Sequence, residues 1–208
     1  MMKKYLVIGN PIDHSLSPKI HNFWIKDNNI NAVYEKRKIK EEDLGNLILE
    51  VKKKNIHGIN VTVPFKKTII SHLDHLSIES DSTQSVNTIY LNDNKITGHN
   101  TDIEGFERSI KDTNQNLENK KIFILGAGGV VPSIIFALYK MRVSKITISN
   151  RTRNKAEQLK DLFKDLQIID WGEIPDFDII INATSVGLEK GDEINLDFSK
   201  IGKNKFFY

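Results

Sequence analysis

The stretch KKIFILGAGGVVPS, residues 120–133, decides the architecture of the second half of this chain. Its four apolar residues 122–125 have the pattern of a strand buried on both faces of a sheet. The strand stops at a glycine-rich turn, residues 126–129, and an apolar, helix-like segment at 130–141 follows. A strand that runs through glycines into a helix is typical of the turn that binds the pyrophosphate of a dinucleotide.

The glycines of this turn have separate uses in that interpretation. Gly126 permits the tight turn, and Gly128 lets the backbone approach a pyrophosphate, which the free N–H groups at the helix start can bind. The fingerprint is incomplete, because Val131 stands where a third glycine normally allows close packing of helix against strand. A purely structural turn is therefore the alternative interpretation of these residues alone.

The composition is that of an ordinary globular protein and excludes several classes. With 39% hydrophobic and 27% charged residues, a chain of 208 residues can bury a sizeable core. The absence of cysteine excludes disulfides and thiolate metal sites, and we assign no metal ligand. The net charge of +3 is small for this length and gives no indication of a nucleic-acid partner. Because no apolar run reaches the roughly 18 residues of a membrane span, we expect no membrane partner and a cytoplasmic location.

The order of the predicted elements divides the chain into two α/β domains. Residues 1–115 alternate strand-like and helix-like segments and end in a helix that begins near Thr101. Residues 112–119 are polar and lack apolar periodicity, which is typical of a linker. From residue 120 onward strands and helices alternate regularly, which predicts a doubly wound parallel sheet of the Rossmann type. We therefore place one domain at 1–115 and a nucleotide-binding domain at 120–208.

The last residues, 204–208, have the pattern of a buried strand but carry no terminating signal. A parallel sheet normally has helices on both faces. We therefore expect the second domain to be truncated at its C-terminal end.

Cations after the second strand of the nucleotide domain favour NADP over NAD. An NAD site usually has an acidic residue about 20 residues past the glycines, where it binds the ribose 2′-hydroxyl. Asn150 lies near that distance with no acid nearby, and it is followed by Arg151, Thr152, Arg153 and Lys155. An arginine can bind a 2′-phosphate through two hydrogen bonds while it stacks on adenine. The alternative is a basic helix start exposed at the surface.

The segment NVTVPFK, residues 60–66, is a candidate ligand site in the first domain. It alternates polar and apolar residues, so Asn60 and Thr62 share one face of a strand and Lys66 follows the strand end. Ligands of α/β proteins bind beyond strand ends. Polar decoration of an edge strand is the alternative interpretation.

Two further polar stretches have structural interpretations beside the chemical one. Asp102, in Asn100-Thr101-Asp102, offers a carboxylate at a helix start, where a first-turn acid is common. Ser15 and Ser17 precede Pro18 and can serve as a helix-start cluster.

Taken together, these stretches resemble the shikimate dehydrogenase family over essentially the whole chain. The matching motifs are IGNPIDHSLSP at 8–18, NVTVPFK at 60–66, VNT at 86–88, NTD at 100–102, GAGG at 126–129, NRT at 150–152 and INATSVG at 181–187. Their order is that of the family, which argues against chance agreement. The resemblance implies reversible NADPH-dependent reduction of 3-dehydroshikimate to shikimate, in chorismate and aromatic amino acid biosynthesis.

The resemblance also implies roles for individual residues. Lys66 and Asp102 match the family's catalytic pair. The groups that bind the substrate's carboxylate and hydroxyls are matched by Ser15, Ser17, Asn60, Thr62 and Asn87. The cofactor residues implied are Gly126, Ala127, Gly128 and Gly129 at the pyrophosphate, Asn150, Arg151, Thr152 and Lys155 at the 2′-phosphate, and Thr184 and Ser185 near the nicotinamide. Lys155 stands where the family often has arginine, so it should supply charge without the planar fork.

The chain departs from the family at several points, and alternatives stay open. Ile103 replaces a usual glycine, and residues 130–132 replace small residues and an arginine. A tyrosine motif, a glycine and C-terminal helices with which family members continue are not in this sequence. One alternative is a quinate/shikimate dehydrogenase that prefers NAD, and the other is a non-catalytic module that binds NADP or shikimate. The expected partner is a small-molecule substrate, and a homodimer is allowed.

Overall fold

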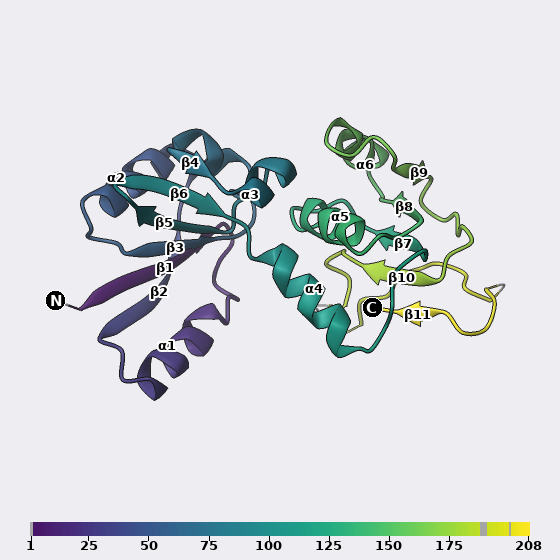
Figure 1. The fold of residues 1–208 in the computed structure, drawn as a ribbon, viewed down its shortest axis with the longest axis horizontal. Helices are drawn as coiled ribbons and strands as arrows, with labels where there is room; N and C mark the ends of the chain where they lie inside the picture. Colours follow the sequence, from purple (N-terminus) through teal and green to yellow (C-terminus); the bar gives the residue numbers. More distant parts are fainter. Residues whose placement is uncertain (1, 188–190, 200) are drawn as a thin grey trace. The chain divides into compact units, whose positions relative to one another are not determined.

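The computed structural model describes residues 2–187, 191–199 and 201–208. The chain forms two compact units, Met1–Thr101 and Asp102–Tyr208, and each is built on one β-sheet (Figure 1). The division lies earlier in the chain than the boundary at 115–120 that we predicted. The reason is that the helix α4 (Asp102–Asp112) buries its apolar face in the core of the second unit. None of the helices in the described ranges is long and apolar enough to cross a membrane.

The sheet of the first unit has six strands in the order β2-β1-β3-β5-β6-β4. Their bounds are β1 (Lys3–Gly9), β2 (Ala32–Lys38), β3 (Gly58–Val61), β4 (His75–Leu76), β5 (Thr88–Asn92) and β6 (Lys95–His99). The strands β2, β1 and β3 are parallel, whereas β5 pairs antiparallel with both β3 and β6. Asp93 and Asn94 both have positive φ in the tight turn between β5 and β6. Consequently β1, β2, β3 and β6 end, and β5 begins, at one common edge.

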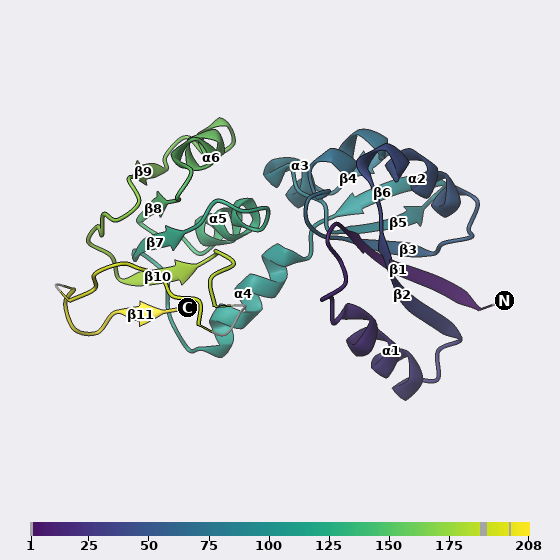
Figure 2. The same ribbon diagram turned by 180° about the vertical axis from the view of Figure 1, so that it is seen from behind.

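Helices cover both faces of this sheet. Figure 1 shows α1 (Ser17–Asp27) and α2 (Leu44–Lys52) on opposite sides of the strands, and Figure 2 gives the same arrangement from behind. Side chains alternate along β1 accordingly, since Leu6 and Ile8 join the core that includes the apolar residues of α2. Tyr5 and Val7 lie in a separate cluster on the opposite face. The remaining helical elements are α3 (Ile78–Thr83) and the 3-10 turns Glu41–Asp43 and Thr68–His72.

The second unit is an all-parallel sheet with the strand order β11-β10-β7-β8-β9. Its strands are β7 (Lys121–Leu125), β8 (Lys145–Ser149), β9 (Gln167–Ile169), β10 (Ile179–Asn182) and β11 (Phe206–Phe207). The chain reverses its direction of winding between β10 and β7, which is the arrangement of Rossmann domains, and ligands bind there beyond the strand ends. The prediction of an α/β protein with a parallel second sheet is confirmed.

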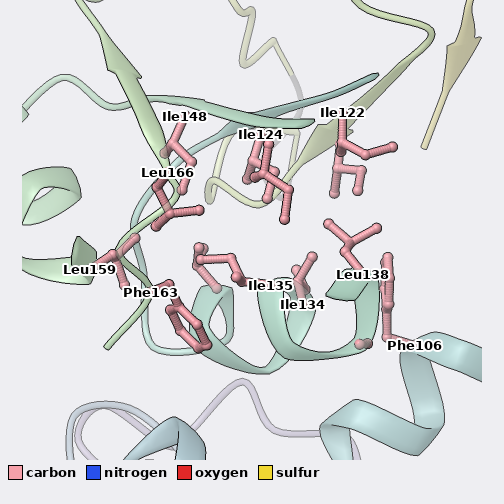
Figure 3. Close-up of a cluster of buried hydrophobic side chains, with 14 of the residues drawn as sticks. Phe106, Ile122, Ile124, Ile134, Ile135, Leu138, Ile148, Leu159, Phe163 and Leu166 are labelled. Carbon is pink, nitrogen blue, oxygen red and sulfur yellow. The ribbon is translucent and has the colours of Figure 1, made fainter. Parts of the chain in front are cut away.

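The two faces of this second sheet are covered differently. The helices α4, α5 (Val131–Lys140) and α6 (Arg153–Glu157) pack on one face, and Figure 3 shows Ile135 and Leu138 of α5 directed toward Ile124 of β7. On the other face Phe123 and Phe177 are buried beneath partly buried residues from segments 171–174 and 194–201. Within the described residues, no helix of this unit contributes to that second cluster. Each fully buried apolar side chain stabilises the fold by roughly 1.5–3 kcal/mol.

Candidate functional site

In the first unit, the loops that follow β1 and β3 lie side by side at the common strand edge. The backbone N–H of Asn10 donates to the carbonyl oxygen of Val63 at 3.0 Å, and each loop contains a cis proline bond. A Cβ at Gly9 would lie 2.7 Å from Cγ2 of Thr62, so only glycine permits this approach. The loops that carry the serines at 15 and 17 and the stretch 62–66 therefore meet at one place.

The two serines flank the start of α1. The backbone N–H of Ser17 donates to Oγ of Ser15 at 3.4 Å, and the N–H of Ser15 donates to the carbonyl of Ile12 at 3.0 Å. Both serines are half-buried. The two serines stabilise the turn before α1, and their hydroxyl groups lie at the edge of the sheet.

Asn60 occupies the middle of a polar row across three strands. Its Oδ1 accepts from the hydroxyl of Tyr34 at 2.6 Å. Its Nδ2 donates to the carbonyl of Asn87 at 3.2 Å and to Oγ1 of Thr88 at 3.1 Å. The hydroxyl of Thr88 in turn donates to Oδ1 of Asn87 at 3.0 Å. Two predicted substrate residues, Asn60 and Asn87, are thus joined in one network.

The backbone of Lys66 and that of Thr101, the residue before Asp102, are hydrogen-bonded to two consecutive residues, Val86 and Asn87. The N–H of Val86 donates to the backbone carbonyl of Lys66 at 2.8 Å. The next residue, Asn87, accepts through Oδ1 from the N–H of Thr101 at 3.0 Å. Asp102 follows Thr101 directly and is the first residue of α4. Lys66 is half-buried, so part of the residue is covered by the protein and part is open to a ligand.

Four residues of this network escaped the sequence-based assignment. Tyr34 and Thr88 contact Asn60, and Thr101 contacts Asn87. Asn100 is 2% exposed and donates to Oγ1 of Thr83 at 3.2 Å and to the carbonyl of Ser85 at 3.0 Å. Of the four, Thr88, Asn100 and Thr101 had a signal, because they belong to the quoted VNT and NTD motifs. Nothing in the sequence marks Tyr34, since an aromatic residue in a strand is usually part of the core.

The glycine-rich turn of the second unit has the geometry that a dinucleotide requires. Gly126 has a φ of +107°, and a Cβ there would lie 2.7 Å from the carbonyl oxygen of Ala183. At Gly128 the nearest atom to such a Cβ is 3.9 Å away, and at Gly129 nothing lies within 4 Å. Gly126 is therefore required by the fold, whereas the space beside the two later glycines is open.

The N–H groups of this turn are available to a ligand. Those of residues 127–130 donate to none of the described residues, while the N–H of Gly126 bonds to the carbonyl of Ser149 at 2.9 Å. Such groups at the start of a helix bind phosphate oxygens. Val131 is completely buried at the helix start, so a valine is accommodated where the fingerprint has its third glycine. The turn fits the pyrophosphate of NADP.

The loop after β8 presents one unpaired guanidinium. The side chain of Arg151 is exposed and pairs with none of the described residues, and the same holds for Lys155. Arg153 instead binds Oδ1 of Asp170 at 2.5 Å and Glu157 at 3.1 Å. Of the three cations considered from the sequence, Arg153 is thus held by carboxylates, whereas the other two have no such partner among the described residues.

The remaining members of the predicted cofactor set lie in two tight loops. Asn150 donates through Nδ2 to the carbonyl of Thr152 at 2.8 Å, which orders the turn before α6. After β10, Thr184 donates through Oγ1 to Oδ1 of Asn182 at 2.7 Å, and Ser185 is exposed beside it. The N–H of Ala183 binds the carbonyl of Leu125 at 2.8 Å, so this loop lies against the end of β7. All these residues follow the carboxyl ends of parallel strands.

Comparisons with known proteins match both units. A family model described as the shikimate dehydrogenase substrate binding domain matches residues 7–89. A second, described as shikimate/quinate 5-dehydrogenase, matches residues 108–188. A curated relative from Pelagibacter ubique, named shikimate dehydrogenase (NADP(+)), is 60% identical over 100% of this chain and 78% of its own length.

Solved structures give the same result. The shikimate dehydrogenase of Aquifex aeolicus is 37% identical with a TM-score of 0.90, over 99% of this chain and 77% of that one. A shikimate 5-dehydrogenase from Thermus thermophilus, solved in complex with NADP(H) and shikimate, is 32% identical with a TM-score of 0.80. That comparison covers 90% of this chain and 70% of the other.

Proposed function

The chain belongs to the shikimate dehydrogenase family, and we propose that Lys66 and Asp102 are its catalytic pair. It is an NADP-dependent oxidoreductase that interconverts 3-dehydroshikimate and shikimate. The alternative of an NAD-preferring quinate enzyme is not favoured, because the relatives are NADP(+) enzymes and the loop after β8 carries free cations rather than an acid. We assign the substrate site to the first unit and the NADP site to the second.

The assignment of the catalytic pair rests on hydrogen bonds made by two consecutive residues, Val86 and Asn87. Val86 binds the backbone of Lys66 at 2.8 Å, and Asn87 binds the backbone of Thr101, next to Asp102, at 3.0 Å. Hydrogen bonds to the two residues that directly precede β5 hold the two segments more closely than free loops would. This arrangement supports a shared task for the ammonium and the carboxylate.

The chemistry of the reaction suits these two groups. NADPH, when bound, supplies the hydride that reduces the ketone. Negative charge then develops on the substrate oxygen, and the ammonium of Lys66 stabilises it and holds a proton at that oxygen. The carboxylate of Asp102 orients this ammonium and, in the reverse direction, the reacting hydroxyl. The hydroxyl and amide groups of Ser15, Ser17, Asn60, Thr62 and Asn87 bind the substrate's carboxylate and remaining hydroxyls.

Absorbance of NADPH tests this function directly. We expect turnover with shikimate and NADP and much slower turnover with quinate and NAD. Binding of NADP or shikimate by calorimetry without any turnover would support a non-catalytic module instead. A homodimer and a cytoplasmic location remain predictions, which analytical ultracentrifugation and cell fractionation test.

A further inference from the structure

Tyr34 connects the first helix of the chain with the predicted substrate site. It lies in β2 with 4% of its surface exposed, and its hydroxyl donates to Oδ1 of Asn60 in β3 at 2.6 Å. The strand β1 separates these two strands in the sheet, so this contact crosses a strand. The site residues implied by the family resemblance do not include Tyr34.

The amide of Asn60 has one chemically allowed orientation. The carbonyl oxygen of Asn87 can only accept a hydrogen bond, so the Asn60 atom at 3.2 Å from it must be Nδ2. The second hydrogen of Nδ2 goes to Oγ1 of Thr88 at 3.1 Å. The oxygen Oδ1 therefore faces Tyr34, and the tyrosine must be the donor of that bond. Both amide hydrogens are used within the protein, and one lone pair of Oδ1 is left.

Three contacts hold Tyr34 in place. The side chain of Asn22 binds the backbone of Tyr34 twice, donating to its carbonyl at 2.7 Å and accepting from its N–H at 3.0 Å. The ring of His21 stacks on the tyrosine ring with centroids 4.1 Å apart and 4° between the planes. Burial raises the pKa of Tyr34, so the hydroxyl keeps its proton and remains a donor at any physiological pH.

We propose that Tyr34 is a positioning residue: its hydroxyl, together with the two bonds of Nδ2, holds the amide of Asn60 so that only Oδ1, an acceptor, is left for the substrate. The remaining lone pair of Oδ1 takes a hydrogen bond from a substrate hydroxyl, and it disfavours a ketone or carboxylate oxygen at that position. Asn60 is half-buried, so this lone pair can reach a ligand. This inference rests on the proposed function and specifies the polarity of one substrate contact.

Tyr34→Phe removes the hydroxyl and keeps the ring that stacks on His21. The amide of Asn60 then loses one of the three bonds that hold it, and we expect the KM for shikimate to rise by roughly three- to tenfold. The kcat should change by less than about twofold and the KM for NADP not at all, because neither hydride transfer nor the cofactor turn is affected. Tyr90→Phe is the matched control, since the hydroxyl of Tyr90 binds none of the described residues.

Analogues of shikimate that each lack one non-reacting hydroxyl give a second readout. The ratio of KM between Tyr34→Phe and wild type should fall to about one for the analogue that lacks the hydroxyl bound by Asn60. It should stay elevated for the other analogue. Equal ratios for shikimate and both analogues, or an unchanged KM for shikimate in a folded variant, would overturn the proposal.

A measurement on the wild-type protein does not depend on the variant folding. The two side-chain amide protons of Asn60, followed by NMR, should keep their chemical shifts to a first approximation when shikimate binds, because both are already bonded. A large shift of either proton would show that Nδ2 donates to the substrate, contrary to the proposal. Absence of shikimate turnover in the wild type would instead refute the proposed function itself.

Discussion

Asn87 binds the backbone N–H and the hydroxyl of Thr101: Oδ1 accepts from the N–H at 3.0 Å, and Nδ2 donates to the hydroxyl at 2.9 Å. Because only 9% of Asn87 is exposed, its truncation leaves a buried cavity and removes its bonds to Thr101 and Thr88. We expect Asn87→Ala to lower the free energy of unfolding by about 1–3 kcal/mol and to lower turnover. Thr101→Val removes only the hydroxyl contact and should cost less. Denaturant titration of both variants tests this, and an Ala variant as stable as wild type contradicts it.

Removing the ammonium of Lys66 should affect turnover far more than substrate affinity. We expect Lys66→Ala to lower kcat by at least about a hundredfold, the scale for one positioned charge-stabilising group. The KM for shikimate should change little, since the serine and asparagine contacts remain. Lys67→Ala is the matched control, because this exposed neighbour pairs with none of the described residues. If turnover stays within a few-fold while affinity collapses, Lys66 is a binding residue only.

Arg151 should distinguish the two cofactors. We expect Arg151→Ala to weaken NADP binding by about 1.5–3 kcal/mol, the scale of a charge-assisted hydrogen bond, and to leave NAD binding nearly unchanged. Arg153→Ala serves as the control, since Asp170 and Glu157 already occupy that guanidinium. It should leave the ratio of the two affinities as it is. Equal losses of NADP and NAD in Arg151→Ala, measured by calorimetry, would show that Arg151 does not bind the 2′-phosphate.

Much of the fold could be predicted because the patterns that specify it are local. The alternation of strands and helices after residue 120 predicted a parallel sheet, and the structure has one, with α5 after β7 and α6 after β8. Predictions failed where tertiary contacts decide. Thr62 was expected on the same strand as Asn60, whereas β3 ends at Val61 and the carbonyl of Val63 bonds instead to Asn10 of the loop after β1.

Only those site residues that belong to the family motifs could be predicted from the sequence. The family motifs identified Asn60 and Asn87. The periodicity of a strand predicts which face of the sheet a side chain lies on, but it does not predict which residue of another strand that side chain contacts. Tyr34 therefore went unnoticed, although its hydroxyl meets Asn60. The same limit applies to Arg153, whose sequence neighbours suggest a phosphate ligand while Asp170 holds it from another strand end.

His21 should make the stability of the chain depend on pH. Burial against Tyr34 and Trp24 lowers its pKa, so the unfolded chain takes up a proton at higher pH than the folded one. The stabilising contribution is therefore fully present above about pH 6.5 and is lost as the pH falls toward the lower folded-state pKa. His21→Phe keeps a stacking ring without a titrating group. In denaturant titrations, the stability difference between this variant and wild type should shift in favour of the variant as the pH falls; a constant difference contradicts this.

The turn after β7 gives a stability prediction with an internal control. Gly126 has a φ of +107°, which an alanine adopts only with strain, and a Cβ would lie 2.7 Å from the carbonyl oxygen of Ala183. The neighbouring atom belongs to the backbone after β10, where the N–H of Ala183 is already bonded to Leu125. The contact is therefore not relieved by rotating a side chain. We expect Gly126→Ala to lower the free energy of unfolding by at least about 2 kcal/mol.

Gly129→Ala adds the same methyl group three residues later in the same turn. No positive φ is found at Gly129, and a Cβ there would meet no atom within 4 Å. This variant should stay within about 0.5 kcal/mol of wild type, the usual range for a substitution without a buried contact. Denaturant titration of the two variants side by side separates the local geometry from a general intolerance of alanine in the turn. Equal destabilisation by both would mean that the approach of Ala183 to Gly126 is not what requires glycine at the end of β7.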